Sequence, residues 1–439
     1  MRNAFSLKSG AGCFSGSRTI RTLSRIRPLV IAFIIIALLV GVGIGYVIVP
    51  APAPPKSTLP STIPIGVMVT LTGSFSSYGA RAEAAAKVAN TQINDYVQSL
   101  GIPTTFNFLY EDTQTSPPSV ALTDLQTLYT QGVKVVVGGM TSGEMAAIDS
   151  FADTNHIVVI DGTSTAGRAS VAPPGDYEFR DLPAGGAEGA ALTAAIMSKG
   201  YKNVAMITAS DTYTLSIRQA FKNAWLAAGG NLVADVNYSY PATTDFTVQL
   251  NTLQSAVAPL LAQNKSVAIF ANMWEDVATM LAQAKSSNSP LLSLTWFGND
   301  NFAQDNTIIS NAGAAVVNQV KLVSVVFAAP LTPTHAELNS EVNASIGQVP
   351  DIYACATYDA AWIAALSILT AGQYNGTLIK TAVPTIAGQY YGATGNTALN
   401  SLGDRNTMDM DYWAVVSGTW QEVATYSSVD QSVTWLMAV

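Results

Sequence analysis

The stretch Ile65–Asn94 reads IGVMVTLTGSFSSYGARAEAAAKVANTQIN, and it decides the fold class. It begins with the apolar run Ile65–Leu71, whose length and β-branched residues predict a buried strand. A turn-rich patch, Thr72–Gly79, and an Ala-rich helical segment follow. Strand, loop and helix in this order form the first step of a parallel sheet, whose ligands lie beyond the carboxyl ends of the strands. Tyr78 is the large side chain able to wall such a binding mouth, although an ordinary loop with a packed tyrosine fits the stretch equally well.

The same alternation of apolar strands and helices continues along the chain. A helix is predicted over Val120–Gln131. Further strands are predicted at Phe106–Tyr110, VKVVVGG (133–139), Ile157–Ile160, Val204–Thr208, Ser266–Ala271 and Leu292–Phe297. This pattern is typical of stacked βαβ units, so the fold class is α/β with parallel sheets flanked by helices.

The N-terminal part of the 439-residue chain has a different composition. Leu29–Val49 is an uncharged apolar run long enough to span a bilayer. Six basic residues and no acid precede it, which predicts a cytoplasmic N-terminal side. We therefore predict a basic cytoplasmic segment (1–27), one transmembrane anchor (28–49) and an extended Pro-rich linker (50–63). A cleaved signal peptide, with Ala51-Pro52-Ala53 as its cleavage site, is the alternative.

Charge and cysteine content limit the possible partners. Beyond Ser57 there are 14 basic and 29 acidic residues, a balance of −15, which argues against a nucleic-acid partner. Cys13 and Cys355 lie on either side of the predicted anchor, so neither an intrachain disulfide nor a cysteine metal cluster is expected. HExxH, GxSxG, Walker A and CxxC motifs are missing, and the two histidines, His156 and His335, form no catalytic pattern. The sequence predicts neither an enzyme nor a bound cofactor or metal.

From the first strand to about residue 425 the chain resembles the extracytoplasmic binding proteins for leucine, isoleucine and valine, within the type I periplasmic binding protein superfamily. The family's P-L-T-G-x-x-A-x-x-G-like loop reads TLTGSFSSYG here, with Thr70 in place of proline. The closing segment GATGNTALNSLGDRNTMDMDYWAVVSGTWQEV matches G-x-T-G…GDR…Y-x-V…G-x-W, and we interpret it as structural. The resemblance implies two lobes joined by three hinge strands, with residues 64–183 and 328–403 in the first lobe and 184–327 and 404–439 in the second.

Two strand ends in the first lobe carry hydroxyl side chains. VVVGGMTSGEMAAI places Ser142 at a helix start, where backbone N–H groups favour an anion. The resemblance implies that Ser142 binds a ligand carboxylate, whereas the residues alone also allow a helix N-cap. IVVIDGTSTAG repeats the arrangement, and Thr163 and Thr165 match family residues on the same carboxylate. Asp161 replaces the usual serine, and we expect this acid near a carboxylate site to alter what binds, unless the segment is only a polar turn.

The second lobe is expected to supply the other end of the site. Tyr213 in ASDTYTLSIRQAF matches the tyrosine that closes over the ligand, and Trp274 stands where the family often has tyrosine, although the residues alone also allow either side chain to belong to the core. In SLTWFGNDNFAQD, Asp300 occupies the place of the carboxylate that holds the substrate's ammonium group, where glutamate is common.

The resemblance therefore predicts a membrane-tethered solute-binding protein that captures a branched-chain or related amino acid and delivers it to the permease of an ABC importer. Closure of the two lobes about the hinge would hold the ligand. Three alternatives remain open: a sensor ectodomain of the same fold, a binder of an amide, urea or short peptide, and an extracellular enzyme.

Overall fold

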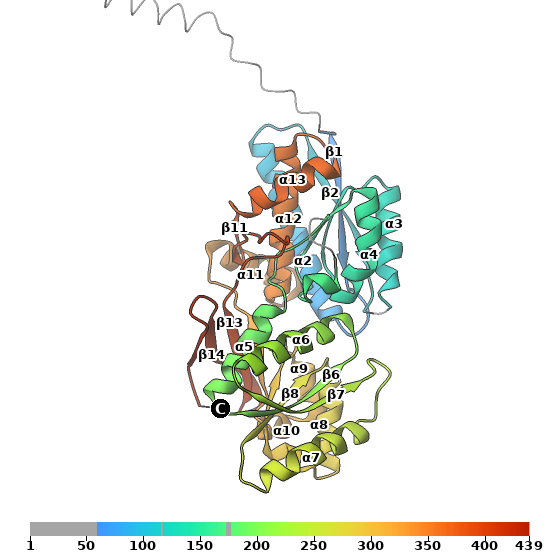
Figure 1. Cartoon of the computed structure of the whole chain (residues 1–439). Helices are drawn as coiled ribbons and strands as arrows, with labels where there is room; N and C mark the ends of the chain where they lie inside the picture. The colour runs from blue at the N-terminus through green and yellow to red at the C-terminus, as the bar shows by residue number, and fades with distance from the viewer. Residues whose placement is uncertain (1–58, 116, 173–176, 439) are drawn as a thin grey trace, which may run out of the picture. The chain divides into compact units, whose positions relative to one another are not determined.

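The computed structural model describes residues 59–115, 117–172 and 177–438. The predicted basic segment, the anchor and most of the linker lie outside these residues, as does Cys13. Among the described residues, α12 alone is long and apolar enough to cross a membrane, but it is a core helix of the first lobe. The two lobes described below each contain one large sheet (Figure 1).

The first sheet is entirely parallel and has the order β2-β1-β3-β4-β5. Its strands are β1 (Thr62–Val69), β2 (Thr105–Asp112), β3 (Val135–Gly139), β4 (Val158–Asp161) and β5 (Glu178–Arg180). Alternate residues of β1 face opposite sides: Ile65 and Val67 join one apolar core, and Met68 joins the other. The sheet is thus buried on both faces, as its continuous apolar strands predict.

The helices of the first lobe come from two distant parts of the sequence. They are α2 (Ser76–Ser99), α3 (Ser119–Thr130), α4 (Ser142–Asn155), α11 (Pro333–Ile346), α12 (Ile352–Ala371) and α13 (Gly376–Ala387). Helices α3 and α4 share one core with the sheet, whereas α2, α11, α12 and α13 share the other. Figure 1 shows the late helices beside the early α2, so the chain returns to this lobe after building the second.

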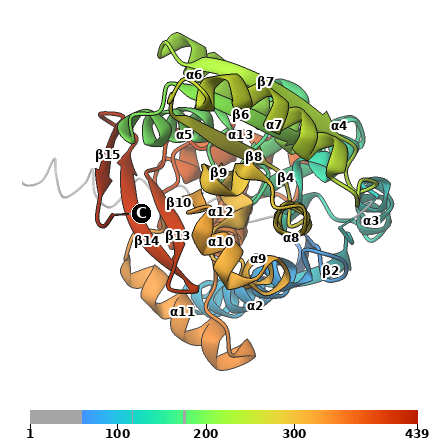
Figure 2. The same ribbon diagram turned by 90° about the horizontal axis from the view of Figure 1, so that it is seen from below.

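The second sheet is mixed and has the order β15-β14-β13-β10-β9-β8-β6-β7 (Figure 2). Its parallel strands are β6 (Asn203–Ala209), β7 (Asn231–Tyr238), β8 (Val267–Asn272), β9 (Thr295–Gly298) and β10 (Val323–Phe327). The antiparallel strands are β13 (Met410–Val416), β14 (Thr419–Ser427) and β15 (Ser432–Trp435). Its helices are α5 (Gly186–Ser198), α6 (Thr212–Ala227), α7 (Thr247–Leu261), α8 (Val277–Ser286), α9 (Asn306–Ala312) and α10 (Ala314–Gln319). The closing segment thus supplies an antiparallel extension to this sheet.

The first and last chain crossings between the lobes run side by side. The Arg180 amide donates to the Gly403 carbonyl and the Arg405 amide to the Arg180 carbonyl, both at 2.9 Å. Arg180 Nε lies 2.7 Å from Asp404 Oδ1, and both side chains are fully buried. The GDR segment therefore contributes a buried ion pair at the crossing, beside the short hairpin of β11 (Tyr391–Gly392) and β12 (Gly395–Asn396).

Several predicted element boundaries are wrong, among them those of the first strand, of the linker and of one strand in the second lobe. The linker does not extend through residue 63, because β1 begins at Thr62 and pairs with β2 from that residue. Pro64 is tolerated since pairing with β3 begins only at Gly66. The predicted strand Leu292–Phe297 begins three residues too early: the 3₁₀ helix η2 (Pro290–Ser293) comes first, started by Pro290 and capped by the Ser289 side chain.

Candidate functional site

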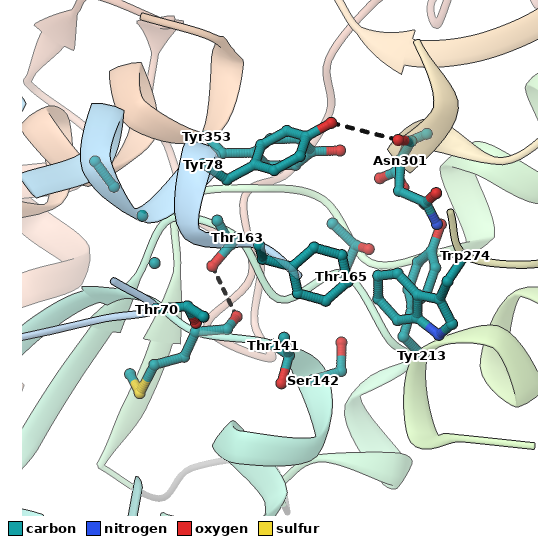
Figure 3. Close-up of a pocket in the computed structure, with 16 residues that line it drawn as sticks. Thr70, Tyr78, Thr141, Ser142, Thr163, Thr165, Tyr213, Trp274, Asn301 and Tyr353 are labelled. Carbon is teal, nitrogen blue, oxygen red and sulfur yellow. Dashed lines mark hydrogen bonds between the residues drawn. The ribbon is translucent and has the colours of Figure 1, made fainter. Parts of the chain in front are cut away.

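A pocket between the two lobes is lined by every residue that the sequence predicted for the ligand (Figure 3). These residues are Tyr78, Ser142, Thr163, Thr165, Tyr213, Trp274 and Asp300. These residues follow the carboxyl ends of strands. In the first lobe the strands are β1, β3 and β4, and in the second lobe they are β6, β8 and β9. The carboxyl ends of the strands therefore converge on one cavity, as in other open parallel sheets. The structure brings these residues together; their roles toward a ligand stay predictions.

Tyr78 lies in the first turn of α2, not in the predicted loop, because this helix begins at Ser76. Its hydroxyl donates to the Asn301 carbonyl in the second lobe at 3.4 Å (Figure 3). Next to it, the ring of Phe75 contacts Trp274, with 4.8 Å between ring centroids. Trp274 is oriented by a 2.7 Å hydrogen bond from its indole N–H to Asp211. Aromatic side chains thus join the lobes across the pocket.

The start of α4 has an N-cap other than Ser142. Thr141 is the N-cap, and it forms a capping box with Glu144: each side chain accepts the other residue's backbone N–H. Burial raises the pKa of Glu144 to about 8. Ser142 is the first helical residue, and its hydroxyl oxygen accepts the Ala166 amide at 3.1 Å while also bonding the Ser164 hydroxyl. Much of its hydrogen-bonding capacity therefore ties α4 to the next loop.

The two threonines of the next loop differ in what they can offer a ligand. The Thr163 hydroxyl donates to the Met140 carbonyl at 2.7 Å, and its amide donates to Asp161 (Figure 3). For Thr165, the backbone N–H and the hydroxyl have no hydrogen-bond partner among the described residues. Thr165 is thus the residue on this wall with two free donors, which suits a carboxylate.

Asp161 does not line the pocket, and its expected effect on what binds stays a prediction. Its carboxylate is fully buried and accepts the amides of Met140, Thr163 and Ser164. Burial raises its pKa to about 6, opposed by these hydrogen bonds and by the charge of Arg180. Asp161 is therefore the structural hub that holds the two hydroxyl-bearing loops together.

Asp300 begins the 3₁₀ helix η3 (Asp300–Phe302) after β9, and its side chain is 5% exposed. The Tyr213 hydroxyl donates to Asp300 Oδ1 at 2.5 Å, and the Tyr353 hydroxyl bonds the same carboxylate. Burial raises the pKa of Asp300 to about 6. The Tyr213 ring therefore lines the pocket, while its hydroxyl donates to Asp300.

A second acid lies behind Asp300. The Glu188 side chain is fully buried, and its Oε1 accepts the Asp300 amide at 3.1 Å. Burial, and then the charge of Asp300, raise the pKa of Glu188 well above its ordinary value. No lysine, arginine or histidine lines the pocket among the described residues, so the charge of Asp300 has no protein cation beside it.

The chain's similarity to known proteins agrees with this geometry. Residues 62–418 match the model of a family described as periplasmic binding protein. The chain belongs to the periplasmic binding protein family. This finding confirms the resemblance to the type I superfamily and the two-lobed α/β fold. The family is one of solute-binding proteins that act outside the cytoplasm, not of enzymes.

Individual members of the periplasmic binding protein family extend the comparison. An uncharacterized protein of Methanocaldococcus jannaschii is 29% identical over 391 residues, which cover 85% of this chain and 92% of that protein. A leucine binding protein from Thermotoga maritima has a TM-score of 0.70 at 19% identity, covering 84% of this chain and 99% of the other. A solute binding protein from R. palustris in complex with 4-hydroxybenzoate has the same TM-score at 16% identity, covering 83% and 97%. At these identities the solved structures establish the shared fold alone.

Sequence reasoning did not find four residues that shape this binding protein's pocket. Phe75, Asn301 and Tyr353 line the cavity, and Glu188 supports Asp300 from behind. Asn301 directly follows Asp300 and could have been found from that position alone. Tyr353 lies in the first turn of α12, two residues after the N-cap Asp351. Glu188 stands among small residues in AGGAEGAAL and gives no readable signal.

Proposed function

We propose that this protein is the solute-binding subunit of an ABC importer and that it captures a small zwitterion, a branched-chain or related amino acid, between its lobes. The ligand's carboxylate would meet the first lobe at Thr165 and the start of α4. Its cationic nitrogen would face Asp300 in the second lobe. The observation that carries the proposal is the pairing of free donors on one wall with a buried acid lacking a protein cation on the other.

The cavity supports a small ligand. Its volume of about 90 Å³ exceeds what a single water needs and is that of a site for a small molecule. An amino acid with a short aliphatic side chain fits this limit, and the aromatic walls suit apolar atoms. A peptide of several residues exceeds it.

Other ligand classes predict different behaviour. An aromatic acid such as the 4-hydroxybenzoate of the R. palustris neighbour would use the aromatic walls. It would leave the Asp300 charge buried without a partner, which is unfavourable. An amide or urea would have no negative group for the donors of Thr165. A sensor of the same fold would bind the same ligand and differ in its partner.

Isothermal titration of the full chain in detergent micelles tests the ligand class. The matched set is leucine, leucinamide without the carboxylate, 4-methylpentanoate without the ammonium, and 4-hydroxybenzoate. We expect leucine or valine to bind and each truncated analogue to bind at least 30-fold more weakly, since each leaves a buried charge or donor set unpaired. Equal binding of 4-methylpentanoate or preference for 4-hydroxybenzoate would contradict the zwitterion proposal.

The membrane anchor is proposed from the sequence alone, because its residues lie outside the described ones. We expect the native protein to sediment with membranes and to keep its N-terminal segment, since the arginine-flanked run Leu29–Val49 matches a spanning helix. Membrane fractionation with N-terminal sequencing measures both. A soluble mature chain that starts near Ala53 would show that the run is a cleaved signal. Co-purification with a permease, after crosslinking in ligand-loaded membranes, would distinguish the importer subunit from a sensor.

A further inference from the structure

Five aromatic rings of the pocket form a continuous chain that the Asp300 carboxylate closes. In order along the chain, they belong to Tyr353, Tyr78, Phe75, Trp274 and Tyr213. Successive ring centroids lie 6.0, 6.3, 4.8 and 5.1 Å apart. Both ends of the chain, Tyr353 and Tyr213, are hydrogen-bonded to Asp300. We call these five rings and the carboxylate the aromatic circuit.

The aromatic circuit draws on both lobes, so it is complete only where the lobes meet. Phe75, Tyr78 and Tyr353 belong to helices or loops of the first lobe, and Trp274 and Tyr213 to the second. Figure 3 shows the rings of Tyr78 and Tyr353 at one side of the cavity and those of Trp274 and Tyr213 at another. A group inside the circuit would therefore touch aromatic carbon in several directions.

The protein uses part of the hydrogen-bonding capacity around Asp300. Two tyrosine hydroxyls donate to its carboxylate, its side chain is 5% exposed, and the neighbouring Asn301 carbonyl accepts from Tyr78. A primary ammonium needs acceptors for three N–H groups. A fully methylated ammonium needs none, since it is held by negative charge and by the electron-rich faces of aromatic rings.

The ring of Tyr78 already contacts a protein cation, the guanidinium of Arg81. The Arg81 guanidinium lies 4.8 Å from the ring centroid of Tyr78, and Arg81 also pairs with Asp351 at 2.6 Å. Arg81 does not line the pocket, so it leaves the cavity free for a ligand cation.

We propose that the aromatic circuit selects a quaternary ammonium group, so that the ligand belongs to the class of N-methylated amino acids such as betaines. This inference rests on the proposed function, because the carboxylate of the same ligand would bind at Thr165 in the first lobe. The competing use of the rings is to hold the aliphatic side chain of an ordinary amino acid.

Two pairs of ligands separate these uses. Valine and glycine betaine are constitutional isomers, both zwitterions, that differ in whether the carbon groups sit on the side chain or on the nitrogen. The second pair is glycine betaine and 3,3-dimethylbutanoate, which has the same shape with carbon in place of the charged nitrogen. Titration calorimetry on the full chain in detergent should give glycine betaine at least tenfold tighter binding than valine, and at least 30-fold tighter than 3,3-dimethylbutanoate.

The ring contribution is tested at Trp274. Trp274→Leu should weaken glycine betaine by about 10- to 30-fold and change 3,3-dimethylbutanoate far less, because only the charged ligand uses the face of the ring. Fluorination of Trp274 at the indole ring, which lowers its electron density without changing its shape, should weaken glycine betaine progressively with each fluorine. Trp435→Leu in β15, outside the pocket, is the matched control and should change neither ligand.

The outcomes distinguish this inference from the proposed function. If valine binds and glycine betaine binds equally or more weakly, the proposed function stands and the aromatic circuit does not select methylated nitrogen. Equal affinities for glycine betaine and 3,3-dimethylbutanoate, or no response to fluorination, would also overturn the inference. If no zwitterion binds, both proposals fall.

Discussion

Each lobe has a buried acid near the pocket, but the two lobes use these acids in opposite ways. In the first lobe, Asp161 accepts three backbone amides and does not reach the cavity. In the second lobe, Asp300 accepts two tyrosine hydroxyls and lines the cavity. Burial raises the pKa of each to about 6. The two carboxylates differ in their hydrogen-bond partners. They also differ in that Asp300 faces the cavity, whereas Asp161 does not.

This difference indicates that burial or a raised pKa does not by itself mark a ligand-binding acid. Asp161 lies near Arg180, and its hydrogen bonds end on the loops that carry Thr163 and Ser164. Its charge is therefore compensated inside the lobe. Asp300 has tyrosine hydroxyls and a second acid, Glu188, around it, and none of the described residues that line the pocket is a cation.

The largest effect is expected for Asp300→Asn. Removing one partner of a buried charge pair typically costs about 2–5 kcal/mol of binding free energy, because the other charge stays unpaired. Affinity for a cationic zwitterion should therefore fall about 30-fold or more, at about 1.4 kcal/mol per tenfold. Titration calorimetry measures the affinity, and a thermal melt of the ligand-free protein should show no loss of stability, since a costly buried charge is removed.

The exposed Asp430→Asn is the control for the loss of one negative charge. It should leave both quantities unchanged. Unchanged affinity in Asp300→Asn would mean that the ligand's cation lies elsewhere, and the assignment of the second-lobe wall would be wrong.

Asp161→Asn should show the converse behaviour. An amide oxygen cannot accept all three backbone N–H groups, and each buried donor left unpaired costs about 1–3 kcal/mol. We expect the free energy of unfolding to fall by about this amount in urea titrations, with the affinity of the folded protein reduced less than in Asp300→Asn. A variant as stable as the wild type but unable to bind would make Asp161 a ligand residue.

Much of the fold could be predicted because its signals are local. The run Ile65–Leu71 and the Ala-rich segment after it carry the strand and helix periodicities of β1 and α2. The start of β9 could not be predicted, since Leu292 is as apolar as a strand residue and only the cap at Ser289 turns it into η2. The antiparallel addition of β13 to β10 joins residues about 90 positions apart, which leaves no local trace.

The predicted site residues were found through their place at strand ends and through the family resemblance. What the sequence could not give is the direction of each polar group. Thr163 and Thr165 look equivalent in IVVIDGTSTAG, yet the Thr163 hydroxyl is bonded to Met140, whereas the Thr165 hydroxyl has no partner among the described residues. Asp161 and Asp300 likewise differ by tertiary contacts with residues far along the chain, such as Tyr353.

Acid should weaken binding through protonation of Asp300. Its pKa is raised to about 6 in the ligand-free site, and a bound cation lowers it by stabilising the carboxylate. Affinity is therefore full above about pH 6 and should fall up to tenfold for each pH unit below, with one proton released on binding. Calorimetry from about pH 8 to about pH 5, in buffers of different ionisation enthalpy, measures both. A pH-independent affinity in this range would exclude Asp300 as the ionised partner.

The first-lobe wall should show smaller effects, because several donors share one carboxylate. Thr165→Val keeps the shape and removes a hydroxyl, which should cost about 0.5–1.5 kcal/mol, or roughly 2- to 10-fold in affinity. Ser142→Ala is the comparison. The Ser142 hydroxyl accepts the Ala166 amide, so we expect this variant also to lose about 1–3 kcal/mol in its free energy of unfolding. A larger affinity loss in Ser142→Ala than in Thr165→Val, at equal stability, would reverse the assignment.

The smallest effect is expected for Glu188→Gln. Burial and the Asp300 charge raise the pKa of Glu188 well above its ordinary value, so it should be protonated at neutral pH while Asp300 is ionised. Glutamine is nearly isosteric with a neutral acid, and its carbonyl can still accept the Asp300 amide. We therefore expect affinity within about threefold of the wild type at neutral pH.

Glu188→Leu is the matched variant, because it removes the acceptor and leaves the Asp300 amide unpaired. Glu188→Leu should weaken binding more than Glu188→Gln does. The reason is that Asp300 would lose its position, not that the charge of the site would change. If Glu188 were ionised, Glu188→Gln would remove a negative charge next to the ligand cation. Affinity would then fall tenfold or more, and the pH midpoint set by Asp300 would move lower, because a repelling neighbour had been lost. An unchanged affinity in Glu188→Gln would instead mean that the second-lobe wall presents a single negative charge, which matches a ligand with a single positive charge.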